Sequence, residues 1–253
     1  MFLSLRLGAL GIVALCAAAS VASADVVFTD GTFNSANYTA NTPFESNISV
    51  TSSQCSSCGN PSQALQIIAN TSNNNGSNYA QSFVNNTFSY NPGTQGAVLS
   101  ISASVDKDIT VTFPGTLGNS FHPVIEQGGN FYLASIVGTS LVTGPTGGTT
   151  GFETISGSGL TAASFVQFDF ATDAFGTGNP NFDGGPMLFG LAQLLGTNGD
   201  GTLTFVYDNL SLDLSTVPEP TSLVVFGTAL FGFGVIRRRR KSVQIRSRNS
   251  AVV

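Results

Sequence analysis

Apolar and polar residues alternate along the middle of the chain, and this pattern predicts its main elements. The clearest stretch is 99–105, in which every second residue is apolar, as expected for a half-buried β-strand. An Asp-Lys-Asp sequence at 106–108 then predicts a polar turn, and the alternation resumes at 109–113. Residues 99–113 are therefore expected to form a β-hairpin.

Other segments continue the same pattern. Alternation is present at 166–170, 203–205 and 210–214, with shorter candidate strands at 26–28, 48–51, 65–69, 131–137 and 152–155. Residues 187–195 are apolar nearly throughout, which is compatible with a buried strand or a short helix. Segments rich in Gly, Asn and Pro separate the strands and predict turns. About ten strands in one domain predict an all-β fold, an antiparallel jelly-roll-like β-sandwich.

Residues 1–24 have the layout of a secretory signal peptide. Arg6 supplies a positive charge, residues 7–19 are apolar, and small residues follow as far as Ala24. Cleavage after Ala24 would leave an exported domain at 25–216. The alternative is a buried N-terminal helix.

The C-terminal region has three parts in a defined order. Pro218, Glu219 and Pro220 come first, and the two prolines keep the backbone extended and accessible to an enzyme. Residues 221–236 are apolar and, as a helix, would be about 24 Å long, against about 30 Å for the hydrocarbon core of a bilayer. A basic cluster follows, made of Arg237, Arg238, Arg239, Arg240 and Lys241. This cluster favours the cytoplasmic side, so 242–253 would be a cytoplasmic tail and 25–216 would lie outside. The alternative is a core helix of a soluble domain.

Residues 217–241 resemble the PEP-CTERM sorting signal, which combines a Pro-Glu-Pro motif, an apolar helix and an arginine cluster. The resemblance implies that the partner is an exosortase, a membrane-embedded enzyme of Gram-negative bacteria. It also implies an inner-membrane intermediate, cleavage near Pro218, Glu219 and Pro220, and a final place at the cell surface or in a biofilm or exopolysaccharide matrix. The tail at 242–253 departs from the family, whose members usually end close to the basic cluster.

Charge is distributed very unevenly. All 14 acidic residues lie between Asp25 and Glu219, where Lys107 is the only lysine or arginine. So negative a domain repels nucleic acid and anionic lipid head groups, and nucleic acid is not expected as a partner. Cations and neutral or basic polymers stay open, as does a role of the charge in solubility alone.

The two ends of the exported domain resemble those of jelly-roll carbohydrate-binding modules. The carrying residues are the Asp-Gly-Thr-Phe sequence at 30–33 and the Tyr-Asp-Asn-Leu-Ser-Leu sequence at 207–212. Such modules often hold a structural Ca²⁺ between the opening and closing strands, so the resemblance implies a calcium site at Asp30, Asp200 and Asp208. Chance clustering in an acidic domain is the alternative. No other cofactor is expected.

Cys55 and Cys58 are the only cysteines left after signal cleavage. In an exported protein the predicted state is a disulfide that closes a small loop. Free thiols, and redox or metal use, are the alternatives. A redox motif would be expected in a βαβ context, and zinc needs four ligands.

No set of catalytic residues is recognisable in the sequence. The single histidine, His122, accompanies no Gly-x-Ser-x-Gly nucleophile elbow. Glu45, Glu126 and Glu153 are isolated, whereas glycosidases pair two carboxylates. We therefore expect a non-catalytic extracellular matrix or cell-envelope protein that binds exopolysaccharide or has a structural role. The alternatives are a secreted polysaccharide hydrolase and a permanently anchored structural surface protein.

Overall fold

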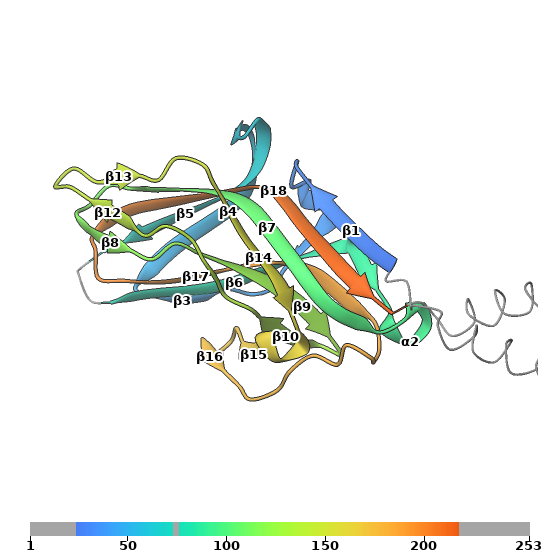
Figure 1. The fold of residues 1–253 in the computed structure, drawn as a ribbon. Coiled ribbons are helices and arrows are strands. Elements are labelled where there is room, and N and C mark those ends of the chain that lie inside the picture. The colour runs from blue at the N-terminus through green and yellow to red at the C-terminus, as the bar shows by residue number, and fades with distance from the viewer. Residues whose placement is uncertain (1–23, 73–75, 218–253) are drawn as a thin grey trace, which may run out of the picture. The chain divides into compact units, whose positions relative to one another are not determined.

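A computed structural model describes residues 24–72 and 76–217 (Figure 1). The predicted signal peptide lies outside the described residues except for Ala24, and so do the Pro-Glu-Pro motif, the hydrophobic segment 221–236 and the basic cluster. Ala24–Thr216 forms one unit by its internal contacts. Within the described ranges, no helix is long and apolar enough to cross a membrane.

Antiparallel strands in two large sheets make up most of this unit. The first sheet contains seven strands: β1 (Ala24–Asp30), β4 (Ile48–Gly59), β5 (Ser62–Thr71), β7 (Val98–Val111), β13 (Gly148–Thr149), β14 (Glu153–Leu160) and β18 (Gly201–Thr216). The second contains nine: β2 (Tyr38–Ala40), β3 (Phe44–Ser46), β6 (Ser77–Tyr90), β9 (Ser120–Gln127), β10 (Asn130–Leu133), β11 (Ile136–Val137), β15 (Val166–Asp169), β16 (Ala174–Phe175) and β17 (Met187–Thr197).

The remaining elements are short. Strands β8 (Gly115–Leu117) and β12 (Leu141–Thr143) pair with each other, and the helical turns are η1 (Ser35–Asn37), α2 (Pro92–Gln95) and η2 (Ala162–Ser164). The main apolar core takes residues from both large sheets. The predicted all-β, antiparallel sandwich is therefore confirmed, whereas its jelly-roll connectivity stays a prediction.

Strand β18 is central to the seven-stranded sheet and lies beside β7 along its length (Figure 1). On its other side, the first half pairs with β5 and the second half with β1. A β-bulge between Asp208 and Ser211 changes the phase of the alternation, and Asn209 has a φ of 51° there. The residues of β18 that belong to the main core consequently occupy odd positions before the bulge and even positions after it: Leu203, Phe205, Tyr207, Leu210, Leu212 and Leu214. The two strand segments predicted at 203–205 and 210–214 are thus one strand.

Strand β7 corrects the hairpin predicted at 99–113. It runs from Val98 to Val111 without a turn, because the alternation continues through 106–108. Lys107 stands in the buried row, and Asp106 and Asp108 are on the opposite face. Lysine is almost never fully buried, so an Asp-Lys-Asp sequence resembles a turn more than the middle of a strand.

The central strands of the nine-stranded sheet, β6 and β17, are buried on both faces. A second apolar cluster, which includes Ala80, Val84 and Ala192, lies on the face turned away from the main core. Strands buried on both faces lack a clear alternation. For this reason β6 was not predicted, and 187–195 was compatible with either a strand or a helix.

Candidate functional site

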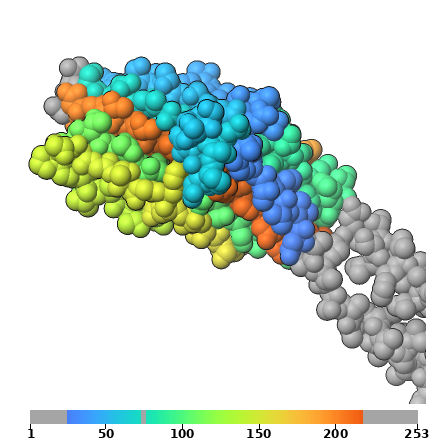
Figure 2. All heavy atoms as spheres, turned by 90° about the horizontal axis from the view of Figure 1, so that it is seen from above, coloured from blue at the N-terminus to red at the C-terminus, as the bar shows by residue number. Residues whose placement is uncertain are grey.

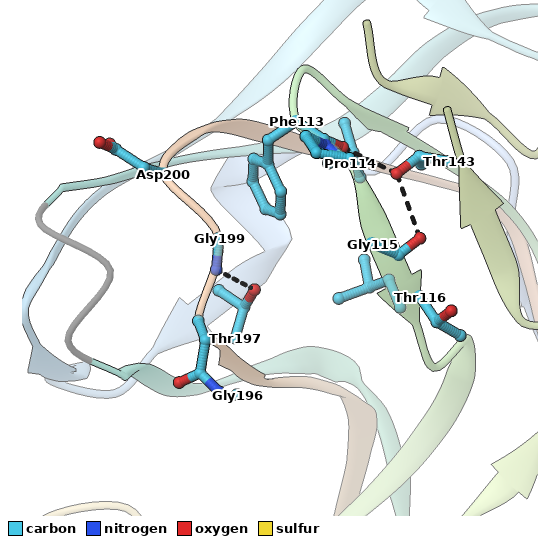
Figure 3. A pocket seen from close by; sticks show the side chains of 12 residues that line it. Phe113, Pro114, Gly115, Thr116, Thr143, Gly196, Thr197, Gly199 and Asp200 are labelled. Carbon is cyan, nitrogen blue, oxygen red and sulfur yellow. Dashed lines mark hydrogen bonds between the residues drawn. The ribbon is translucent and has the colours of Figure 1, made fainter. Parts of the chain in front are cut away.

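A pocket of about 580 Å³ lies where β7 and β17 end, beside β8 and β12 (Figure 3). The side chain of Phe113 projects into the pocket, and the segment 196–200 forms the wall opposite this ring. The lining residues come from the ends of β7 and β17, from the segments that follow them and from β8 and β12, so the sandwich fixes where the pocket lies.

Glycines allow the two walls to approach each other closely. A Cβ added to Gly199 would lie 1.8 Å from Cε2 of Phe113, so the ring packs directly on the glycine backbone. Thr143 Oγ1 donates a hydrogen bond to the carbonyl oxygen of Phe113 at 2.7 Å, and the N–H of Gly199 donates to Thr197 Oγ1 at 3.1 Å (Figure 3). These bonds fix the backbone on both sides of the ring.

The rim of the pocket carries polar groups that are available to a ligand. The side chains of Thr116, Asn198 and Asp200 are exposed, and none of them hydrogen bonds to another residue in the described ranges. The Asp200 carboxylate extends away from the Phe113 ring (Figure 3). The pocket therefore offers a hydroxyl, an amide and a carboxylate around an apolar floor. Phe113 is only 8% exposed, so its ring provides no open surface on which a sugar could stack.

Asp208 is buried on the outer side of β18. It accepts hydrogen bonds from the backbone N–H groups of Asn60, at 2.5 Å, and Asn209, at 2.7 Å. Burial raises the pKa of Asp208, and the nearby carboxylates of Asp106 and Asp30 raise it further. Asp208 and Asp30, two of the three residues predicted to bind calcium, are thus close enough to interact.

Asp200, the third predicted calcium residue, lies elsewhere. It precedes β18 and belongs to the pocket rim, eight residues before Asp208. At about 3.3 Å per residue, an extended chain of this length spans about 26 Å. No group of three or more His, Cys, Asp or Glu side chains in the described part of the chain could hold a metal ion. Calcium binding stays a prediction.

A disulfide links Cys55 and Cys58 just before the β4–β5 turn, with their Cα atoms 5.8 Å apart. The space-filling view shows this turn (teal) on the surface beside β1 (blue) and β18 (orange) (Figure 2). The turn covers Asp208, because a Cβ added to Gly59 would lie 2.7 Å from Asp208 Oδ2.

The residues considered for catalysis do not gather at the pocket. His122 is buried on β9, where Nε2 lies 2.9 Å from Ser120 Oγ and Nδ1 lies 3.1 Å from the carbonyl oxygen of Ala134. Burial lowers the pKa of His122 to about 4. Glu45 is on β3, Glu126 on β9 and Glu153 on β14, and none of them lines the pocket.

Sequence reasoning did not find the residues that form the pocket. The sequence pattern predicts that Phe113 ends a strand and that Gly199 lies in a turn, but it does not predict that the two residues are in contact. Their contact joins positions 86 residues apart in the chain, and no periodicity in the sequence indicates it.

Residues 216–240 match the family model for the PEP-CTERM protein-sorting motif. The sorting signal predicted at 217–241 is therefore confirmed. Such a motif implies export and a membrane-anchored intermediate.

Several solved structures resemble the chain, including two of family 11 carbohydrate-binding modules. One is a family 11 carbohydrate-binding module from Clostridium thermocellum in complex with a β-1,3-1,4-mixed-linked tetrasaccharide, with a TM-score of 0.39 and 14% identity over 76% of this chain and 96% of that one. The other is the family 11 module of a cellulosomal cellulase of the same organism, with a TM-score of 0.38 and 14% identity over 77% and 95% of the two chains. A search of curated proteins finds no match.

Proposed function

We propose that this chain is an exported surface protein, processed by an exosortase, whose β-sandwich binds a neutral polysaccharide without catalysis. The sorting motif is the observation that carries the proposal. It begins at Thr216, the last residue of β18, so cleavage near Pro218, Glu219 and Pro220 would release the sandwich with every strand intact.

The pocket supports polysaccharide binding. Its volume of about 580 Å³ lies within the range of about 300–1,000 Å³ that is usual for small-ligand sites. Thr116, Asn198 and Asp200 supply donors and acceptors that match the hydroxyl groups of a sugar. The excess of carboxylates in the exported domain disfavours an anionic polymer, because like charges repel.

A non-catalytic role is favoured over hydrolysis by the make-up of the pocket. Of its lining residues, Asp200 alone carries a carboxylate. Glycoside hydrolysis ordinarily uses two, one as the acid and one as the base or nucleophile.

Processing is tested by mass spectrometry of the protein released at the cell surface. We expect a C-terminus near Pro218, Glu219 and Pro220. A mature protein that keeps Arg237–Lys241 would instead be a permanently anchored surface protein.

Binding is tested with the processed protein on a glycan array, together with an assay for released reducing sugar. We expect binding without release, weakened at least tenfold by Asp200→Ala and by Asn198→Ala. Asp183→Ala is the matched control, because Asp183 is an exposed acid that does not line the pocket.

Other results would support other functions. Phe175, on the edge strand β16, is 61% exposed, so binding that is lost only in Phe175→Ala would move the site there. Sugar release that disappears on replacing one carboxylate would establish a hydrolase. Neither binding nor release would leave a structural role in the cell envelope or matrix.

A further inference from the structure

Three polar residues occupy one row of the inner face of the seven-stranded sheet. Tyr207 on β18 and Glu153 on β14 are the register partners of Lys107 on β7. Side chains of register partners project from the same face, with Cβ atoms about 4.5–5.5 Å apart. The only lysine or arginine between residues 24 and 217 therefore points into the core, where Lys107 is 2% exposed.

The amino group of Lys107 has an unusual environment. Nζ donates a hydrogen bond to the carbonyl oxygen of Ser120 at 2.6 Å and lies 5.0 Å from the ring centre of Tyr207 and 5.5 Å from that of Phe205. It forms no ion pair with any residue in the described ranges. A buried ammonium without a counter-ion is strongly disfavoured, so the neutral amine is favoured here. Burial lowers the pKa of Lys107 to about 7, so at neutral pH a large fraction has the lone pair of a nucleophile.

Asn119 brings a carboxamide into the same space from the other sheet. It directly precedes Ser120, whose carbonyl oxygen holds Lys107, and it is 1% exposed. Its Nδ2 donates a hydrogen bond to Glu153 Oε1, whereas its Oδ1 has no hydrogen-bond partner among the residues described. A buried amide oxygen without a partner is costly, so an ordinary structural role explains this side chain poorly.

Glu153 interacts with both the amine and the amide. Its Oε1 accepts from Asn119 Nδ2 and also from the backbone N–H of Thr139, at 3.1 Å, which fixes the carboxylate in place. The charge of Glu153 also acts on Lys107, whose protonated form it favours. His122 is the other titratable side chain here besides Tyr207, and its pKa of about 4 leaves it neutral at pH 7.

We propose that Lys107 and Asn119 join in an intramolecular isopeptide bond, with Glu153 transferring the proton. Lys107 Nζ attacks Asn119 Cγ with its lone pair, and a bond forms between these two atoms. Glu153 accepts a proton from Nζ and delivers one to Nδ2, the Cγ–Nδ2 bond breaks, and ammonia leaves. One amine and one primary amide become one secondary amide and one ammonia, with no oxidant or cofactor.

The surroundings suit this reaction. Core residues exclude bulk water, which would otherwise compete with the amine for Asn119 Cγ. The fold holds the two groups together, and this replaces a bimolecular encounter with an intramolecular step. The product would tie β7 to the start of β9, and so one sheet to the other, by a bond that reducing agents do not break.

The bond is tested by mass spectrometry of the full chain, digested with chymotrypsin after denaturation. Chymotrypsin cuts after large apolar and aromatic residues unless proline follows, so cleavage after Leu99, Leu117 and Phe121 separates the Lys107 and Asn119 segments. We expect the two peptides to remain linked, with a combined mass lower by one ammonia. Two unlinked peptides from protein that was folded before digestion would overturn the proposal, whether or not any variant folds.

Variants then assign the roles. Lys107→Met and Asn119→Ala should abolish the linked peptide, and Glu153→Gln should slow its formation by about a hundredfold or more, the usual size of a general acid–base contribution. Glu126→Gln is the matched control and should link as the wild type does. Linkage of Glu153→Gln at the wild-type rate would overturn the role of Glu153. Loss of ammonia that persists in Lys107→Met would place the reaction elsewhere, for example at Asn198-Gly199, and would contradict the proposed bond.

Discussion

The backbone N–H of Asn60 donates a hydrogen bond to Oδ2 of Asp208 at 2.5 Å, across 148 residues of sequence. The bond fastens the β4–β5 turn over the middle of β18, where the outward-facing Asp208 becomes 0% exposed. It lies next to the bulge at Asn209, whose own N–H donates to Asp208 Oδ1. One carboxylate therefore satisfies the backbone both of the bulge and of the turn that covers it.

We expect Asp208→Ala to lower the free energy of unfolding by about 1–3 kcal/mol, because two backbone donors would lose their acceptor in a buried place. Urea unfolding at pH 7 measures the change. Asp213→Ala is the control, since Asp213 also faces outward on β18 but is only partly buried. Equal effects of the two substitutions would mean that the turn does not depend on Asp208.

Calcium is predicted at Asp30, Asp200 and Asp208, and the first and last of these lie close enough to interact. A cation bound only by the folded state raises the melting temperature by mass action. We expect added Ca²⁺ to raise the midpoint of the wild type, and Asp30→Asn and Asp208→Asn to reduce the increase. Asp200→Asn tests whether the start of β18 takes part in calcium binding. If only Asp30 and Asp208 contribute ligands, this substitution should leave the calcium-dependent increase in the midpoint unchanged. A midpoint that is the same with calcium and with a chelator would exclude a structural calcium.

The alternation in the sequence was sufficient to predict the sandwich, but it was misleading where a polar residue faces the core. Lys107 keeps the inward phase of β7, and only its chemistry suggested a turn. The bulge at Asn209 had a visible signal, because the apolar residues change from odd to even positions there. A bulge inside one strand and a break between two strands look the same in sequence, because both change the phase of the apolar alternation.

Contacts between distant segments could not be predicted from the pattern. The polar residues of β6 can be buried because Asn41 pairs with them: its Oδ1 accepts from the Ser82 N–H at 2.7 Å, and its carbonyl oxygen accepts from Gln81 Nε2 at 2.8 Å. Likewise, Asn119 and Glu153 stand 34 residues apart, and neither has a neighbour in sequence that indicates their hydrogen bond. Such pairings depend on the register of strands that the local sequence does not specify.

Acid should destabilise the protein through His122. Its pKa is about 4 in the folded state and about 6.5 when exposed. Because the folded state disfavours the protonated ring, the stability contributed by neutral His122 is fully present above pH 6.5 and is lost as the pH falls toward 4. We expect the free energy of unfolding of the wild type, relative to His122→Gln, to fall by about 2–3 kcal/mol between pH 7 and pH 4.5. Urea titrations at the two pH values measure this difference, in which the other titrating groups cancel. A difference that does not change with pH would show that His122 is accessible to protons in the folded state.

The wall of the pocket should depend on the absence of a side chain at Gly199. A methyl group there would collide with Phe113, so Gly199→Ala should displace the ring, cost about 1–3 kcal/mol by overpacking, and weaken polysaccharide binding. Gly185→Ala is the matched control, because a Cβ at Gly185 meets nothing within 4 Å.

Phe113→Ala alone should also destabilise the protein, by about 3–5 kcal/mol, since it empties the space that the ring fills. The double variant should cost less than the sum of the two single ones, because the new methyl group occupies part of that space. If the changes in the free energy of unfolding, measured with urea, were strictly additive, the two residues would not be in contact. Gly199 would then not form the wall of the pocket opposite Phe113.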